Sequence, residues 1–103
     1  MNGNMQKMMK QAQKLQRQMM EAQDALADER VEGSAGGGMV RVIADGQQNI
    51  VEIKIDPEAV DPEDVEMLED TVLAAVSDAV RKSKELAEER LGVFTKGMKI
   101  PGL

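Results

Sequence analysis

The sequence predicts an elongated α+β protein in which two long helices flank a small antiparallel sheet. Three observations lead to this class. Apolar residues recur at alternating steps of three and four through the first 26 residues, which is typical of an amphipathic helix. Two apolar runs at about 39–44 and 50–56, separated by a polar turn, indicate a hairpin. Acidic residues around a proline at 61–64 then mark the start of a second helix.

The first helix is expected at about 4–27, and its apolar positions form a single seam. The seam consists of Met5, Met8, Ala12, Leu15, Met19, Ala22 and Leu26. Because an exposed apolar stripe associates in water, we expect the seam to serve in packing or dimerisation. Its methionines also suit an adaptable surface for an apolar peptide, so an adaptor or chaperone-like interaction module remains an alternative function.

A third strand at about 29–33 would complete the sheet, because a two-stranded hairpin alone is marginally stable in water. The glycine-rich segment 33–38 is expected to be a flexible connector. It is not expected to hold a nucleotide, since no Lys followed by Ser or Thr follows the glycines, as a phosphate-binding loop requires.

The second helix is expected at about 62–91. Asp61 is placed to cap its N-terminus, Pro62 occupies the favoured first position, and Gly92 is the expected C-terminal cap. Residues 92–103 would then form an irregular tail. Two long helices and a small sheet in a single domain of 103 residues describe an elongated protomer, and its exposed apolar seams favour a homodimer.

The composition excludes most catalytic chemistry. Cys, His, Trp and Tyr are absent, and Phe94 is the only aromatic residue. The chain therefore has no thiol nucleophile, no imidazole base and no soft metal ligand, so we expect no enzymatic activity, no cofactor and no small-molecule substrate. The missing aromatic side chains also argue against a stacking surface for single-stranded nucleic acid, which leaves duplex binding open. No secretory signal or membrane-spanning run is readable, so a soluble cytoplasmic protein without membrane contact is expected.

The net charge of −6 is an average over segments of opposite sign. The first 20 residues carry four bases and no acid, whereas residues 56–80 carry nine acids and no base. Residues 81–103 are basic again. Charge alone leaves two interpretations open: the basic ends neutralise the acidic middle, or they bind a polyanion while the middle faces away.

The cations fall into two clusters with defined positions on the predicted helices. Lys7, Lys10, Lys14 and Arg17 occupy the helix face opposite the seam, and the second cluster is Arg81, Lys82 and Lys84. Such cations can contact DNA phosphates or anionic lipid. Lipid is the weaker alternative, because the apolar face of the first helix lacks the Trp, Phe and abundant Leu of interfacial helices.

Several short motifs together resemble the YbaB/EbfC family of bacterial nucleoid-associated proteins. The motifs are the segment from Gly33 to Val40, Ile55-Asp56-Pro57, Met67-Leu68-Glu69-Asp70, the segment from Ala75 to Ala79, and Gly97-Met98 with Pro101-Gly102-Leu103. The resemblance covers nearly the whole chain and implies a cytoplasmic homodimer shaped like tweezers, with long helices projecting from a three-stranded sheet. It also implies binding to double-stranded DNA in the nucleoid, effects on gene expression and no catalytic activity.

The resemblance does not itself identify the DNA contacts, because the shared motifs are mainly turns, caps and apolar positions. The seven cations of the two clusters are therefore the DNA-binding residues expected from charge and helical placement.

Overall fold

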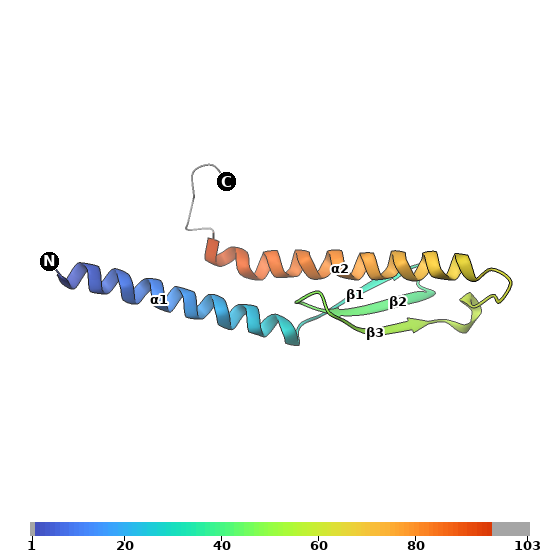
Figure 1. The fold of residues 1–103 in the computed structure, drawn as a ribbon, viewed down its shortest axis with the longest axis horizontal. Coiled ribbons are helices and arrows are strands. Elements are labelled where there is room, and N and C mark those ends of the chain that lie inside the picture. Colours follow the sequence, from blue (N-terminus) through green and yellow to red (C-terminus); the bar gives the residue numbers. More distant parts are fainter. Residues whose placement is uncertain (1, 96–103) are drawn as a thin grey trace, which may run out of the picture.

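A computed structural model describes residues 2–95 and confirms the α+β class (Figure 1). The elements are α1 (Asn2–Ala25), β1 (Arg30–Ala35), β2 (Val40–Asp45), β3 (Ile50–Ile55) and α2 (Val65–Thr95), with short 3-10 turns at Leu26–Asp28 and Pro57–Ala59. The protomer is elongated, as expected, and measures 76 × 29 × 16 Å.

The sheet has the order β1-β2-β3, and both strand pairs are antiparallel. Val42 of the central strand lies opposite Gly33 on one side and Ile53 on the other. Directly opposed residues share a face of the sheet, so these three residues lie on the face that α2 crosses. The opposite face is polar and includes an exposed ion pair between Arg41 Nη1 and Glu32 Oε1, 3.8 Å apart.

The core between α2 and the sheet is built from small side chains. Its fully buried cluster consists of Val40, Val42, Ala44, Ala75 and Ala79. At Gly33, a Cβ atom would overlap the backbone nitrogen of Ala79 and lie 2.6 Å from the carbonyl oxygen of Ala75. The backbones of β1 and α2 can therefore come this close only because residue 33 is glycine.

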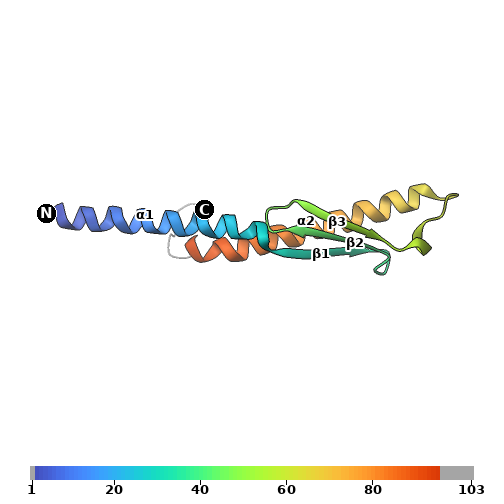
Figure 2. The same cartoon turned by 90° about the horizontal axis from the view of Figure 1, so that it is seen from below.

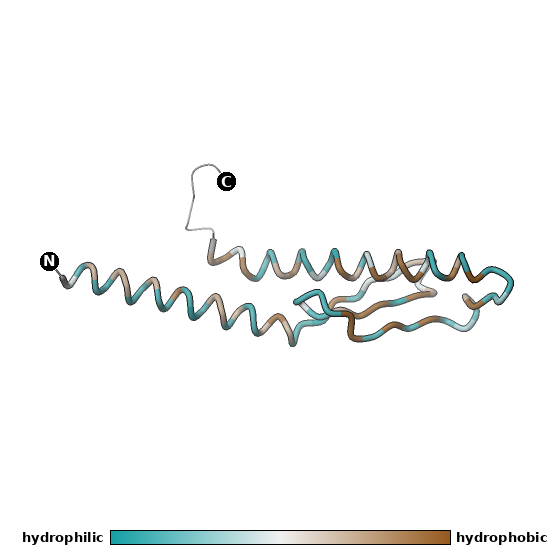
Figure 3. The backbone as a smooth tube through the Cα atoms, viewed as in Figure 1, coloured by the Kyte–Doolittle hydropathy of each residue, from teal (hydrophilic) through white to brown (hydrophobic). Residues whose placement is uncertain are grey.

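Helix α2 leaves the third strand uncovered. Ile50, Ile53 and Ile55 are the cross-strand partners of the core residues of β2, yet they are 38%, 47% and 40% exposed. A helix with its side chains is about 10 Å wide, which spans about two strands. Because α2 packs on β1 and β2, these three residues form an uncovered isoleucine strip on the core face of the sheet. Figure 3 shows the hydrophobic residues concentrated in the strands and α2, with weaker hydropathy along α1.

The sequence predicts a flexible connector over the whole glycine-rich segment 33–38, but only part of this segment forms a turn. β1 continues to Ala35, because residues 33–35 pair with β2 and Gly33 lies directly against α2. The turn itself uses Gly36, Gly37 and Gly38, whose φ angles are 64°, 68° and 89°. Three successive residues in this left-handed region require glycine.

Helix α1 ends at Ala25, two residues before the predicted end at 27. The carbonyl oxygen of Leu26 accepts the N–H of Glu29 at 3.2 Å and the N–H of Gly46 at 2.8 Å. These bonds close a 3-10 turn and tie it to the β2–β3 turn, so the α-helical pattern stops there.

Helix α2 begins at Val65 rather than at 62, and the predicted cap is therefore wrong. The residue that caps it is Asp64, whose Oδ1 accepts the N–H of Met67 at 3.2 Å. Asp61 instead accepts the N–H of Glu63 at 2.9 Å, in a turn before the helix. Both residues are aspartates near the helix start, and the chain uses the later one.

The predicted C-terminal cap at Gly92 is also wrong, because α2 continues through this residue to Thr95. Gly92 does not have a positive φ, and a glycine inside a helix costs only about 1 kcal/mol. Leu91 and Phe94 are half-buried, and their packing favours the extra helical turn. The remaining part of the predicted tail, residues 96–103, lies outside the described residues.

The close contact at Gly33 predicts a strong effect of one added methyl group. Gly33→Ala should lower the free energy of unfolding by about 2–4 kcal/mol, because the backbones of β1 and α2 must separate. Urea denaturation followed by circular dichroism measures the change. The matched control is Gly92→Ala, where a Cβ meets nothing within 4 Å and should be neutral or slightly stabilising. Equal stability of both variants would show that the contact is not tight.

Candidate nucleic-acid interface

Helix α1 projects as an exposed arm from the body of the molecule, which consists of the sheet and α2. Figures 1 and 2 both show its N-terminal half beyond the end of α2. Every residue from 3 to 18 is exposed, and we call this segment the arm. It is rich in Gln, Met and Lys, which are good helix formers, and contains no proline. None of the described helices is long and apolar enough to cross a membrane.

The arm carries the first predicted cluster as a single stripe of positive charge. This cationic stripe consists of Lys7, Lys10, Lys14 and Arg17. Steps of three and four residues place the side chains within an arc of about 80° and an axial length of about 15 Å. All four are exposed, and none is ion-paired to a carboxylate within residues 2–95. The stripe is therefore free to bind a polyanion.

The apolar seam lies on the other side of α1, and the body covers only its C-terminal end. Leu26 is buried, and Met19 and Ala22 are half-buried. The remaining seam residues lie on the arm and are exposed; they are Met5, Met8, Ala12 and Leu15. Within the protomer, the seam thus packs only where α1 meets the body.

The base of the arm is fixed by the turn between β2 and β3. The side-chain Nε2 of Gln47 donates to the carbonyl oxygen of Gln23 at 3.0 Å, next to the bond from Gly46 to Leu26. These contacts set the direction in which the arm leaves the body. The sequence indicated a turn here but not its partner, because the contacts join residues 20 and 24 positions apart.

The second predicted cluster differs from the first, because acidic neighbours compensate most of its charge. Arg81 lies 2.8 Å from Asp78 and 2.7 Å from Glu85, and Lys82 lies 3.2 Å from Asp78. Lys84 is exposed, with no ion pair among the described side chains. The structure does not bring the two clusters together, since one lies on the arm and the other in the middle of α2.

Asp78 holds this network against the sheet. Its carboxylate accepts the backbone N–H of Ser34 at 3.0 Å. That hydrogen bond, followed by those from Arg81 and Lys82, lowers the pKa of Asp78 to about 2. The same carboxylate, together with Glu85, raises the pKa of Arg81 above its ordinary value. The network therefore joins α2 to β1 through Asp78.

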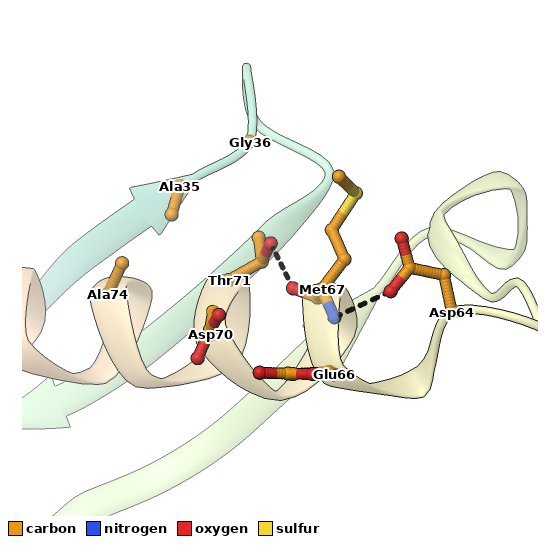
Figure 4. Close-up of a pocket in the computed structure, with 8 residues that line it drawn as sticks. All are labelled: Ala35, Gly36, Asp64, Glu66, Met67, Asp70, Thr71 and Ala74. Atoms are coloured by element: carbon orange, nitrogen blue, oxygen red, sulfur yellow. Dashed lines mark hydrogen bonds between the residues drawn. The ribbon is translucent and has the colours of Figure 1, made fainter.

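A pocket at the other end of the molecule is acidic and does not suit an anionic ligand. Its cavity of about 410 Å³ lies between the start of α2 and the β1–β2 turn (Figure 4). Asp64, Glu66 and Asp70 line it, and Thr71 Oγ1 donates to the carbonyl oxygen of Met67 at its wall. Residues 2–95 contain no group of three acidic side chains arranged to hold a metal ion. The arm thus remains the candidate surface for nucleic acid.

A solved structure shares this fold. An uncharacterized protein from Helicobacter pylori superposes with a TM-score of 0.68, covering 80% of this chain and 86% of the other at 21% sequence identity. At this level of identity, the likeness shows the fold alone.

Relatives of higher identity are nucleoid-associated proteins. One from Pelotomaculum thermopropionicum is 52% identical over 103 residues, covering 100% of this chain and 98% of the relative. Another, from a Geobacillus species, is 63% identical over 101 residues, covering 98% and 94%. The class that this fold and these relatives define is that of the nucleoid-associated proteins. Within that class, the YbaB/EbfC DNA-binding family matches residues 1–98, and the chain belongs to this family.

The lowered pKa of Asp78 predicts a specific loss of stability in acid. The ionised carboxylate stabilises the fold above the ordinary pKa of 3.8, and this contribution disappears as the pH falls towards about 2. The melting temperature of the wild type should therefore fall more steeply between about pH 4.5 and 2 than that of Asp78→Asn. Asp24→Asn, an exposed site on α1, is the control and should follow the wild type. Parallel curves for all three proteins would contradict the assignment.

Proposed function

We propose that this protein is a non-enzymatic homodimer that binds duplex DNA in the nucleoid, within the cytoplasm, mainly through phosphate contacts. By this binding it contributes to nucleoid organisation and gene expression. The observation that carries the proposal is the cationic stripe: an exposed array of uncompensated charge on the projecting arm of a DNA-binding family member. Neither a membrane nor a small-molecule substrate is part of the proposal.

Phosphates suit the stripe better than base edges do. Three of its four side chains are lysines, whose flexible amines act as point charges and release counterions when they meet phosphates. No described contact fixes the side chain of Lys7, Lys10 or Lys14 in a direction that would read a base. Binding with little sequence preference follows from this arrangement.

The distribution of charge allows an acidic protein to bind DNA. The acidic segment between β3 and the start of α2 lies at the end of the molecule opposite to the arm, and the molecule is 76 Å long (Figure 1). Charges separated by much more than about 8 Å are screened at physiological salt. Repulsion from the acidic end is therefore small at the stripe. We assign a lesser role to the second cluster, in which only Lys84 is uncompensated among the described residues.

A homodimer is proposed because a second copy would cover the isoleucine strip. The strip lies beside a flank of α2 that carries the exposed Leu73 and the half-buried Val76 and Val80. This flank is opposite to Asp78, which contacts β1, so it faces the β3 side of the sheet. Val76 and Val80 also line a groove of about 480 Å³. The same patch on two copies can form a two-fold interface and give a dimer with two arms.

A second function is favoured by one observation. Met5, Met8 and Met9 are 67%, 69% and 60% exposed, which suits an adaptor or chaperone-like module that binds an apolar peptide. Salt distinguishes the two functions, because it weakens phosphate contacts and preserves or strengthens apolar ones.

Neutralising the stripe should abolish DNA binding. The variant replaces Lys7, Lys10, Lys14 and Arg17 by Gln. If each arm of a dimer meets about four phosphates, log affinity for a short duplex should fall with log salt at a slope near −7, and the variant should lose at least about 100-fold in affinity. Fluorescence anisotropy of a labelled duplex at several salt concentrations measures both quantities.

Two controls accompany this measurement. Arg41→Gln with Lys54→Gln removes exposed cations from the outer face of the sheet and should change the affinity by less than about threefold. The triple replacement of Arg81, Lys82 and Lys84 by Gln tests the second cluster. If that triple variant loses binding while the stripe variant keeps it, the stripe is not the DNA surface.

A charge within the isoleucine strip should separate the dimer. Ile53→Glu places a carboxylate on the uncovered core face, where a partner copy would bury it without a counter-ion. The control Lys54→Glu adds a carboxylate at the next position of β3, on the opposite face. Analytical ultracentrifugation should find a monomer for Ile53→Glu and a dimer for the wild type and the control. A dimeric Ile53→Glu would exclude this interface.

A further inference from the structure

The arm has two exposed faces with different chemistry. The cationic stripe lies on one face, and the exposed part of the seam lies on the opposite face, formed by Met5, Met8, Ala12 and Leu15. Met5 and Met8 are 67% and 69% exposed. Helical geometry separates the centres of the two faces by roughly 150°. Whatever the stripe binds, the seam points away from it.

The proposed function therefore determines what the seam faces. When the stripe lies on the phosphates of a duplex, the opposite face of α1 is turned outward from the DNA. The body cannot cover it, because the body packs against α1 only from Met19 onward. Each DNA-bound arm would thus display an uncovered apolar stripe about 15 Å long.

We propose that the seams of two DNA-bound arms from different dimers pair with each other, so that the protein bridges two duplexes or two segments of one duplex. This inference rests on the proposed function. The occupant is a second copy of α1, because alternating steps of three and four match the seam of another helix with the same spacing. The four exposed seam residues carry no charge, so a paired arm buries no ion.

Charge makes this pairing conditional on DNA. Each free arm carries four positive charges and no acid between residues 3 and 18, so two free arms repel each other. Phosphates neutralise the stripe once the arm is bound, and the repulsion disappears. DNA binding and arm pairing should therefore reinforce each other.

The small size of the seam also makes arm pairing depend on DNA. Four side chains of this kind bury roughly 400 Å² per arm, or about 800 Å² per pair, below the ~1,200 Å² of a stable interface. Pairing in free solution is therefore weak. DNA that holds many copies side by side raises their effective concentration and makes the same contact sufficient.

A bridging assay with matched variants tests the proposal. Beads carrying one biotinylated duplex are loaded with protein, and recovery of a second, fluorescent duplex is measured. The seam variant is Met5→Gln with Met8→Gln, and the control is Met9→Gln with Met20→Gln, two exposed methionines outside the seam. Gln keeps the net charge and the helix propensity. Anisotropy with a single short duplex and ultracentrifugation without DNA are measured on the same proteins.

The seam variant should bind a single duplex within about twofold of the wild type and remain at the same oligomeric state, while its recovery of the second duplex falls at least about fivefold. The control should behave like the wild type in all three measurements. Equal bridging by the seam variant and the control would overturn the proposal, as would a smaller oligomer for the seam variant, since the seam would then hold the dimer itself. Failure of the wild type to bridge, despite normal binding, would also overturn the proposal. Failure to bind even one duplex would overturn the proposed function as well.

Discussion

The contact between the backbones of α2 and β1 determines the rest of this architecture. Gly33 has no side chain that would keep the helix away from β1. On the helix, Ala75 and Ala79 face this glycine with small side chains. The helix is thereby placed over β1 and β2, and one helix is only wide enough for two strands. Two hydrogen bonds then hold its flank against β1: Asp78 accepts the backbone N–H of Ser34, and Lys82 Nζ donates to the carbonyl oxygen of Glu32. The uncovered third strand is a direct consequence of this offset.

The β2–β3 turn connects the arm helix α1 to α2. It is held against α2 by the buried hydroxyl of Ser83, which donates to the carbonyl oxygen of Asp45 at 2.6 Å and accepts the N–H of Gln48 at 3.1 Å. The same turn holds the end of α1, and an ion pair between Arg90 and Glu29 joins that end to α2. The orientation of the arm is therefore set by the body, so charge on the arm stays far from the acidic end of the molecule.

The sequence predicted those features that depend on local patterns. The seam, the cationic stripe and the alternation in β3 are periodic within one element, and the structure contains each element in the predicted order. The exposure of Ile53 depends on contacts between distant elements and was not predictable. The choice of Asp64 over Asp61 as the cap was not predictable either, because both aspartates accept an N–H two or three residues further along the chain. The neutralisation of the Arg81 charge by acidic neighbours could have been predicted from the sequence, although we did not predict it. Asp78 and Glu85 stand three and four residues away from it on a helix, a spacing that the sequence already displayed.

The small size of the core has a consequence for the stability of the folded chain. Among the described residues, only six hydrophobic side chains are fully buried, three of them alanines. A chain with so little interior has a narrow margin of stability, and the proposed binding to a second copy and to DNA would add to that margin by mass action. Its folded fraction would then rise with its own concentration and with the amount of free DNA.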